Sequence, residues 1–120
     1  LLYRPYRLQT AAGDLSIVFR DHRLSDLIGF TYGSMPPKRA AADLVGHLEP
    51  IAQKLKQHQS SGSSSLEQPW LVTIALDGEN CCEYYPQDGK PFLENLYQTL
   101  SNHSHIKLVT VSEFLDAFPP

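Results

Sequence analysis

The order of the predicted elements indicates an α/β fold with a mostly parallel sheet. Apolar runs that predict strands alternate with segments whose apolar residues recur at helical spacing, which is typical of such sheets. The run at residues 70–76 is apolar apart from Thr73, which predicts a strand buried on both faces. Two or three parallel strands cannot close a barrel, so we expect the chain to be an incomplete part of a larger fold.

The first part of the chain predicts a hairpin followed by two helices. Residues 1–10, a turn at residues 11–14 and the apolar run at residues 15–19 predict strand, tight turn and strand. Apolar residues at helical spacing predict a short helix over residues 24–30. A longer helix is expected from Pro36-Pro37, because proline is tolerated in a first turn. Its apolar stripe predicts packing against the core, while Pro50 predicts a kink or break near Glu49.

The second part predicts a loop and two further strand and helix pairs. Residues 59–68 are rich in serine and glycine, which predicts a flexible surface loop within one domain, 1–120. After the strand at residues 70–76 come a turn at residues 87–89 and a helix that Pro91 opens. A strand over residues 106–111 and a last helix over residues 113–118, capped by Ser112, complete the prediction.

Composition excludes several classes of partner. The formal net charge is -3 and the isoelectric point about 5.9, which gives no electrostatic case for nucleic acid or an anionic membrane. No apolar run approaches a membrane span, and no secretory signal is visible. The adjacent cysteines Cys81 and Cys82 form no disulfide framework or zinc pattern, and we expect a cytoplasmic protein.

Polar side chains follow the strand predicted at residues 70–76. Asp77-Gly78-Glu79-Asn80 supplies two carboxylates, an amide and a flexible glycine at the carboxyl end of a strand, where active sites of parallel α/β folds collect. Glu83, Tyr84 and Tyr85 add a carboxylate and two rings, a common lining for a sugar site. The alternative is an ordinary solvated turn, since Asp-Gly is a frequent turn pair.

The strand at residues 15–19 also ends in polar residues. Arg20, Asp21 and His22 could bind substrate or orient a catalytic carboxylate. The alternative is an ion pair with a helix cap. His47 is expected to serve packing or the surface.

Two motifs and a closing segment together resemble glycoside hydrolase family 57, which includes amylopullulanases, α-amylases, 4-α-glucanotransferases and branching enzymes. They are Phe19-Arg20-Asp21-His22 with Leu24-Ser25-Asp26-Leu27-Ile28-Gly29-Phe30, then Leu76-Asp77-Gly78-Glu79-Asn80 with Glu83-Tyr84-Tyr85-Pro86, and Leu108-Val109-Thr110-Val111-Ser112-Glu113-Phe114-Leu115. The resemblance implies a partial (β/α)7 barrel, a fragment of a larger catalytic domain, and a retaining mechanism on α-glucans. It implies no metal and no cofactor.

The resemblance also implies roles for residues. Asp77 corresponds to the general acid/base, one of two carboxyls that retaining chemistry holds about 5–5.5 Å apart. The family's nucleophile is a glutamate on an earlier strand, and no segment here matches that motif. Cys82 stands where the family commonly has tryptophan. The residues expected to bind substrate or support the site are Arg20, Asp21, His22, Asp26, Glu79, Asn80, Glu83 and Tyr84.

Two alternatives to catalysis by the parent domain stay open. The chain could be a non-catalytic carbohydrate-binding or structural fragment of a degenerate relative. It could instead belong to a polysaccharide deacetylase, which has a similar barrel. A deacetylase would need a metal-binding set of aspartate and histidine, which only Asp21 and His22 could begin. In the glycosidase interpretation the partners are an α-glucan or oligosaccharide substrate and the remainder of the catalytic domain.

Overall fold

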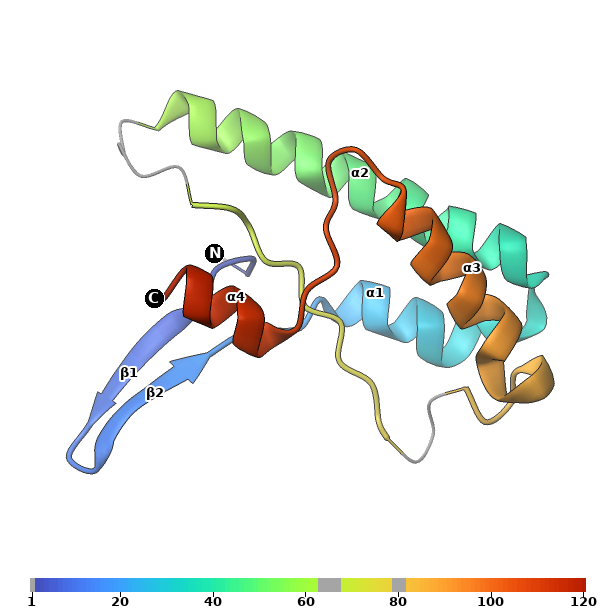
Figure 1. Cartoon of the computed structure of the whole chain (residues 1–120), viewed down its shortest axis with the longest axis horizontal. Coiled ribbons are helices and arrows are strands. Elements are labelled where there is room, and N and C mark those ends of the chain that lie inside the picture. The colour runs from blue at the N-terminus through green and yellow to red at the C-terminus, as the bar shows by residue number, and fades with distance from the viewer. Residues whose placement is uncertain (1, 63–67, 79–81) are drawn as a thin grey trace.

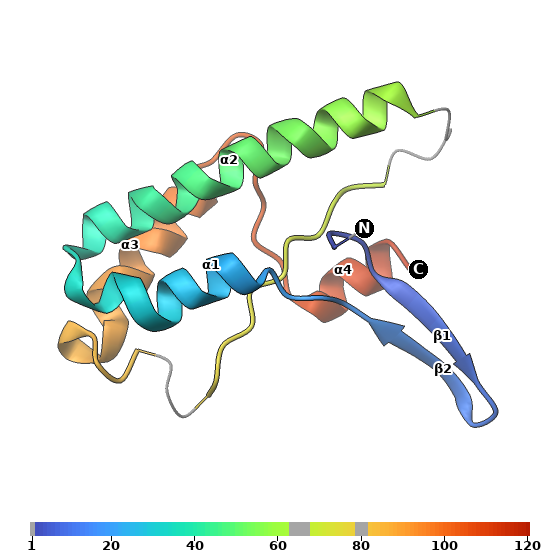
Figure 2. The same ribbon diagram turned by 180° about the vertical axis from the view of Figure 1, so that it is seen from behind.

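A layer of helices carries an antiparallel hairpin at one end (Figure 1). The computed structural model describes residues 2–62, 68–78 and 82–120. The hairpin consists of β1 (Tyr6–Thr10) and β2 (Gly13–Ile17), with Tyr6 opposite Ile17 and Leu8 opposite Leu15. This confirms the strand, turn and strand predicted at the start of the chain. Seen from behind, the hairpin again extends away from the helices (Figure 2).

The helices follow in an order close to the predicted one. They are α1 (His22–Asp26), a π-helical turn (Leu27–Thr31), a 3₁₀ turn (Tyr32–Ser34), α2 (Pro37–Ser61), a 3₁₀ turn (Pro86–Gly89), α3 (Lys90–Ser101) and α4 (Val111–Ala117). Helix α2 packs against α3, and α1 lies alongside them. The core lies between these helices and is built from Leu24, Ile28, Tyr32, Ala40, Ala41, Leu44, Val45, Leu48, Cys82, Tyr85, Phe92, Leu96 and Leu100.

The predicted (β/α)7 barrel with mostly parallel strands is wrong for this chain as it folds here. Among the described residues, the strands form only the antiparallel pair β1–β2. The segments predicted as strands at residues 70–76 and 106–111 are irregular instead, apart from one parallel bridge between Arg20 and Thr73. A strand is stabilised by a ladder of backbone hydrogen bonds to a neighbouring strand, and within the described chain these segments have no such ladder.

Two helix boundaries also differ from prediction. Helix α2 runs through Pro50 without the expected break near Glu49. The cap of α4 is Thr110 rather than Ser112: its hydroxyl accepts from the Glu113 amide, and the Glu113 carboxylate accepts from the Thr110 amide. Of the predicted loop at residues 59–68, the first residues extend α2 to Ser61, and residues 63–67 lie outside the described part.

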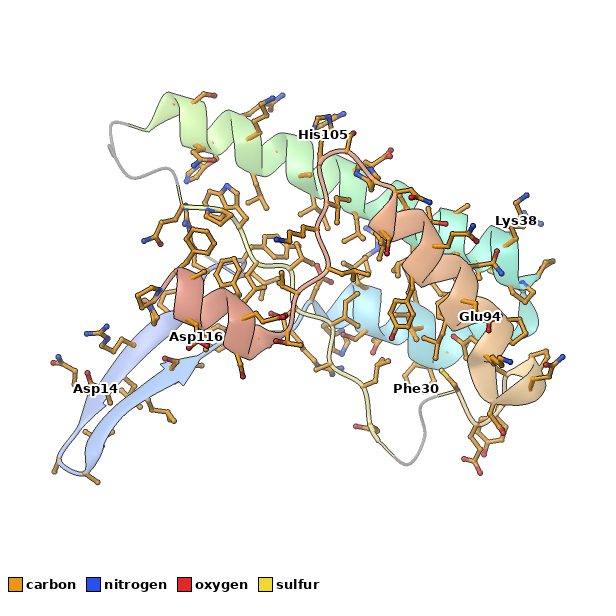
Figure 3. All side chains as sticks on the ribbon, in the orientation of Figure 1. Asp14, Phe30, Lys38, Glu94, His105 and Asp116 are labelled. Carbon is orange, nitrogen blue, oxygen red and sulfur yellow. The ribbon has the colours of Figure 1, made fainter. Side chains whose placement is uncertain are left out.

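The molecule is less compact than its length predicts. Its radius of gyration is 16.0 Å, whereas a compact domain of this length would have about 14 Å. Charged side chains such as Asp14, Lys38 and Glu94 lie on the outside (Figure 3). Large apolar side chains are exposed as well, among them Leu8, Leu15, Phe19, Phe30, Tyr84, Leu108 and Val109. The hairpin and the segment before α4 therefore present apolar surface to solvent.

Candidate active site

The polar end of the first predicted strand lies beside the second predicted strand. Arg20 and Thr73 form a parallel bridge, in which the Asp21 amide donates to the Thr73 carbonyl at 2.7 Å. Two residues beyond Thr73, the Ala75 amide donates to the Ser25 hydroxyl on α1 at 3.3 Å, and Arg20 Nη1 lies 3.5 Å from the Ala75 carbonyl oxygen. Asp77 follows two residues later, exposed to solvent. Arg20 and Asp77 therefore emerge from neighbouring segments.

Asp21 is buried and its carboxylate is fully engaged. One oxygen accepts from the Leu24 amide at 2.9 Å and caps α1, and the other accepts from the Tyr3 hydroxyl at 2.6 Å. Burial, reinforced by the bond to Asp21, raises the pKa of Tyr3 to about 12, so the phenol stays protonated and donates. Asp21 thus anchors the N-terminal segment and α1 beside the bridge. Sequence reasoning missed Tyr3, because nothing local to it signals a partner 18 residues away.

His22 and Asp26 pair with each other on the exposed face of α1. His22 Nδ1 lies 3.2 Å from Asp26 Oδ2, four residues along the helix. His47 likewise lies 3.3 Å from Asp43, which also accepts the Tyr32 hydroxyl at 2.7 Å. Burial and this hydrogen bond raise the pKa of Tyr32 above its usual value. Within the described ranges, no three histidine, cysteine, aspartate or glutamate side chains gather as metal ligands would.

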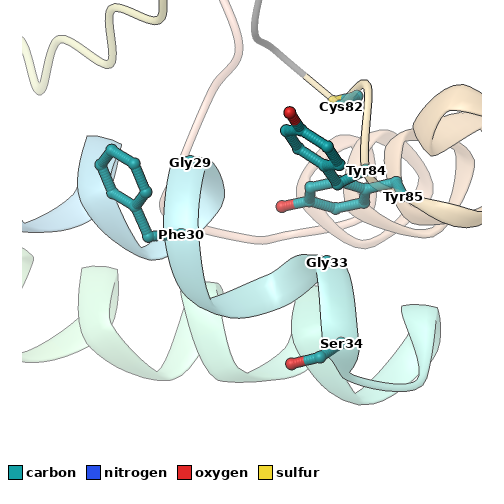
Figure 4. Close-up of a pocket in the computed structure, with 7 residues that line it drawn as sticks. All are labelled: Gly29, Phe30, Gly33, Ser34, Cys82, Tyr84 and Tyr85. Carbon is teal, nitrogen blue, oxygen red and sulfur yellow. The ribbon is translucent and has the colours of Figure 1, made fainter.

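The remaining predicted residues fall in two places. Glu79 and Asn80 lie outside the described residues. Glu83 and Tyr84 are exposed after Cys82, and Tyr84 lines a pocket of about 350 Å³. Gly29, Phe30, Gly33, Ser34, Cys82, Tyr84 and Tyr85 line this pocket (Figure 4). Of the predicted site residues that the structure describes, Tyr84 lines this pocket, whereas Arg20, Asp21 and Asp77 do not and belong to the bridge region.

Tyr85 fixes one wall of the pocket. Its hydroxyl donates to the Ile28 carbonyl, and its ring packs on Phe92 with centroids 5.3 Å apart. A Cβ on Gly33 would lie 3.4 Å from the Tyr85 ring, so glycine allows the ring to lie close to the helical turn. Cys82, at a positive φ of 65°, is buried at the same wall. Sequence patterns predicted the rings at positions 84 and 85 but not the facing turn that contains Phe30.

A comparison with known protein families identifies the class of protein to which the chain belongs. The family model described as Glycosyl hydrolase family 57 matches residues 1–120, the whole chain. The chain therefore belongs to glycosyl hydrolase family 57, which confirms the resemblance drawn from its motifs. A search of the curated proteins finds no match to it. No described helix is both long and apolar enough to cross a membrane.

Proposed function

We propose that this chain provides Asp77 as the general acid/base of a retaining glycoside hydrolase or transglycosylase domain that acts on α-glucans. The observation that carries this proposal is the parallel contact between residues 20–21 and 73–75, at the ends of two segments predicted as strands. Asp77 is two residues beyond Ala75, so its Cα lies within about 7 Å of that of Ala75 by chain geometry. The Arg20 guanidinium, beside the Ala75 carbonyl, is a nearby cation for a substrate or a carboxylate.

The proposed role follows from the chemistry of retaining glycosidases. The acid gives a proton to the leaving oxygen while a second carboxylate attacks the sugar, and the resulting base then activates water or an acceptor hydroxyl. Asp77 is exposed and therefore accessible to a substrate. We propose that Glu79 and Asn80 support the loop and that the nucleophile comes from the remainder of the catalytic domain.

Two features of residues 70–76 support a larger domain around this chain. Within the described residues, the buried atoms Trp70 Nε1 and Thr73 Oγ1 have no hydrogen-bond partner. Buried polar groups without partners cost about 1–3 kcal/mol each, so native folds rarely retain them. A neighbouring strand, which the rest of the catalytic domain would supply, offers such partners.

The test is turnover of maltooligosaccharides by the full-length protein that contains this chain. Asp77→Asn should lower kcat by about 10²-fold or more, because an amide cannot supply the proton. Glu79→Gln should have a milder effect. Asp116→Asn, which changes an exposed carboxylate on α4, is the matched control and should match wild type. Near-normal turnover by Asp77→Asn together with loss of turnover in Glu79→Gln would contradict the proposal and assign the acid/base role to Glu79.

A further inference from the structure

Phe30 is a large apolar residue that is almost fully exposed. Its side chain is 87% exposed, although its neighbour Ile28 is in the core. Ile28 and Tyr32 lie four residues apart and both face the core, whereas Phe30, two residues from each, faces outward within the π-helical turn Leu27–Thr31. Such π-helical turns often mark functional sites. An outward phenyl ring at the edge of a pocket provides a contact surface for a ligand.

A second aromatic ring lies on the other side of the same pocket. Tyr84 is 85% exposed, and Figure 4 shows Phe30 on one side of Gly29 with Tyr84 and Tyr85 on the other. Gly29, in the turn between the two rings, has no side chain, and a Cβ placed there would meet nothing within 4 Å, so the pocket is open beside Gly29. Ser34 and Tyr84 add hydroxyls to this otherwise apolar lining.

These features define the chemistry of the occupant. A pyranose ring has apolar C–H faces and a rim of hydroxyls, which suits a pocket with aromatic walls and a few hydroxyl groups. The pocket volume of about 350 Å³ lies at the small end of ligand sites, which fits one sugar unit rather than a bulky group. Within the described residues the lining carries no charged side chain, which disfavours a phosphate or another anion.

The position of the pocket relative to Asp77 determines what it would bind. Asp77 and Cys82 are five residues apart in sequence. At about 3.3–3.6 Å per residue, their Cα atoms can be at most about 18 Å apart. An oligosaccharide whose scissile bond lies at Asp77 can therefore extend far enough to place another of its sugar units in the pocket.

We propose that Phe30 and Tyr84, on the two sides of Gly29, form an outer subsite that holds one glucose unit of an α-glucan away from the scissile bond. This proposal rests on the proposed function. Phe30 acts as a positioning and specificity-determining residue, because it contacts a remote unit and not the reacting atoms. The subsite favours long substrates over short ones, since only a long chain reaches both the pocket and Asp77.

The experiment measures kcat and KM of the full-length protein on maltoheptaose and on a short nitrophenyl α-glucoside. Phe30→Ala should raise KM for maltoheptaose about three- to tenfold, the range expected for one lost aromatic contact, with kcat nearly unchanged. KM for the short substrate should stay at the wild-type value. Phe30→Trp should restore KM for maltoheptaose. Tyr97→Ala, which removes an exposed ring of α3 outside the pocket, should match wild type.

The outcomes separate the two proposals. Unchanged kinetics of Phe30→Ala on maltoheptaose, in a protein whose wild type turns it over, would overturn the subsite and leave the role of Asp77 standing. An equal rise in KM for the long and the short substrate would also overturn the subsite, because a remote subsite cannot affect a substrate that does not reach it. Absence of any turnover of α-glucans by the wild type would overturn both proposals.

Discussion

At the scale of single residues, Gly89 has the clearest steric requirement. Its φ is +82°, and a Cβ there would lie 2.5 Å from Cys82 Cβ and 2.8 Å from Cys82 Sγ. Gln87 and Asp88 before it also have positive φ, at 52° and 54°. Gly89 therefore lets the turn close against Cys82, the residue at the pocket wall.

Gly89→Ala should destabilise the protein by about 2 kcal/mol or more, because alanine combines an unfavourable φ with a steric clash. Chemical denaturation monitored by circular dichroism measures this change. Gly46→Ala is the matched control: Gly46 lies inside α2 with nothing within 4 Å of its added Cβ, so alanine should be neutral or stabilise by up to about 1 kcal/mol. Equal stability of the two variants would refute the close approach at Gly89.

Residue-scale predictions from the sequence succeeded where the determining chemistry is local. The turn at residues 87–89 and the helix after it follow from Asp-Gly and from proline in a first helical turn. The outward position of Phe30 also follows from helical spacing, because Phe30 is two residues beyond the core residue Ile28. Helical spacing assigns residues 24–30 to one regular helix, and the π-helical turn Leu27–Thr31 could not be predicted from that spacing.

At the scale of elements, α2 shows packing overriding a local rule. Pro50 has no amide hydrogen, so the bond to the Gly46 carbonyl is missing, and the sequence predicted a break there. The helix continues because Leu44, Val45 and Leu48 are held in the core against α3. Proline at this position therefore lowers the stability of α2 without ending it.

Pro50→Ala should stabilise the protein by about 1–3 kcal/mol, because alanine restores the missing hydrogen bond and removes the ring. Thermal and chemical denaturation report the change. Pro37→Ala is the matched control and should have little effect, since Pro37 occupies the first turn of the same helix, where proline is tolerated. A loss of stability in Pro50→Ala would show that the ring is needed for packing.

The prediction of strands at residues 70–76 and 106–111 was wrong for a reason that concerns whole elements. Residues 70–76 and 106–111 have strand composition, but a strand exists only through its neighbours, and the local sequence does not contain them. The first segment keeps one parallel bridge to Arg20, and the second keeps exposed Leu108 and Val109. Helices satisfy their own backbone, which explains why α2 and α3 were predicted with the right type and near the right residues.

At the scale of the whole molecule, the open shape and the exposed apolar residues bear on the proposal of a larger catalytic domain. The 120-residue chain alone should bind a hydrophobic dye or self-associate, because contiguous apolar surface is rarely left exposed on a soluble monomer. Dye fluorescence and analytical ultracentrifugation check this, with the full-length protein as the reference. A monomeric chain that unfolds cooperatively and binds no dye would contradict the proposed larger domain.

The most direct test of the role of Asp77 is rescue of Asp77→Asn by azide in the full-length protein. On an activated α-maltoside with a nitrophenol leaving group, the first step needs no acid, and the covalent intermediate accumulates because no base activates water. Azide needs no such base and attacks directly. We predict that azide accelerates turnover of Asp77→Asn but not of wild type, and that the product is the α-glycosyl azide. Absence of acceleration, or a β-glycosyl azide, would contradict the assignment of Asp77 as the acid/base of a retaining enzyme.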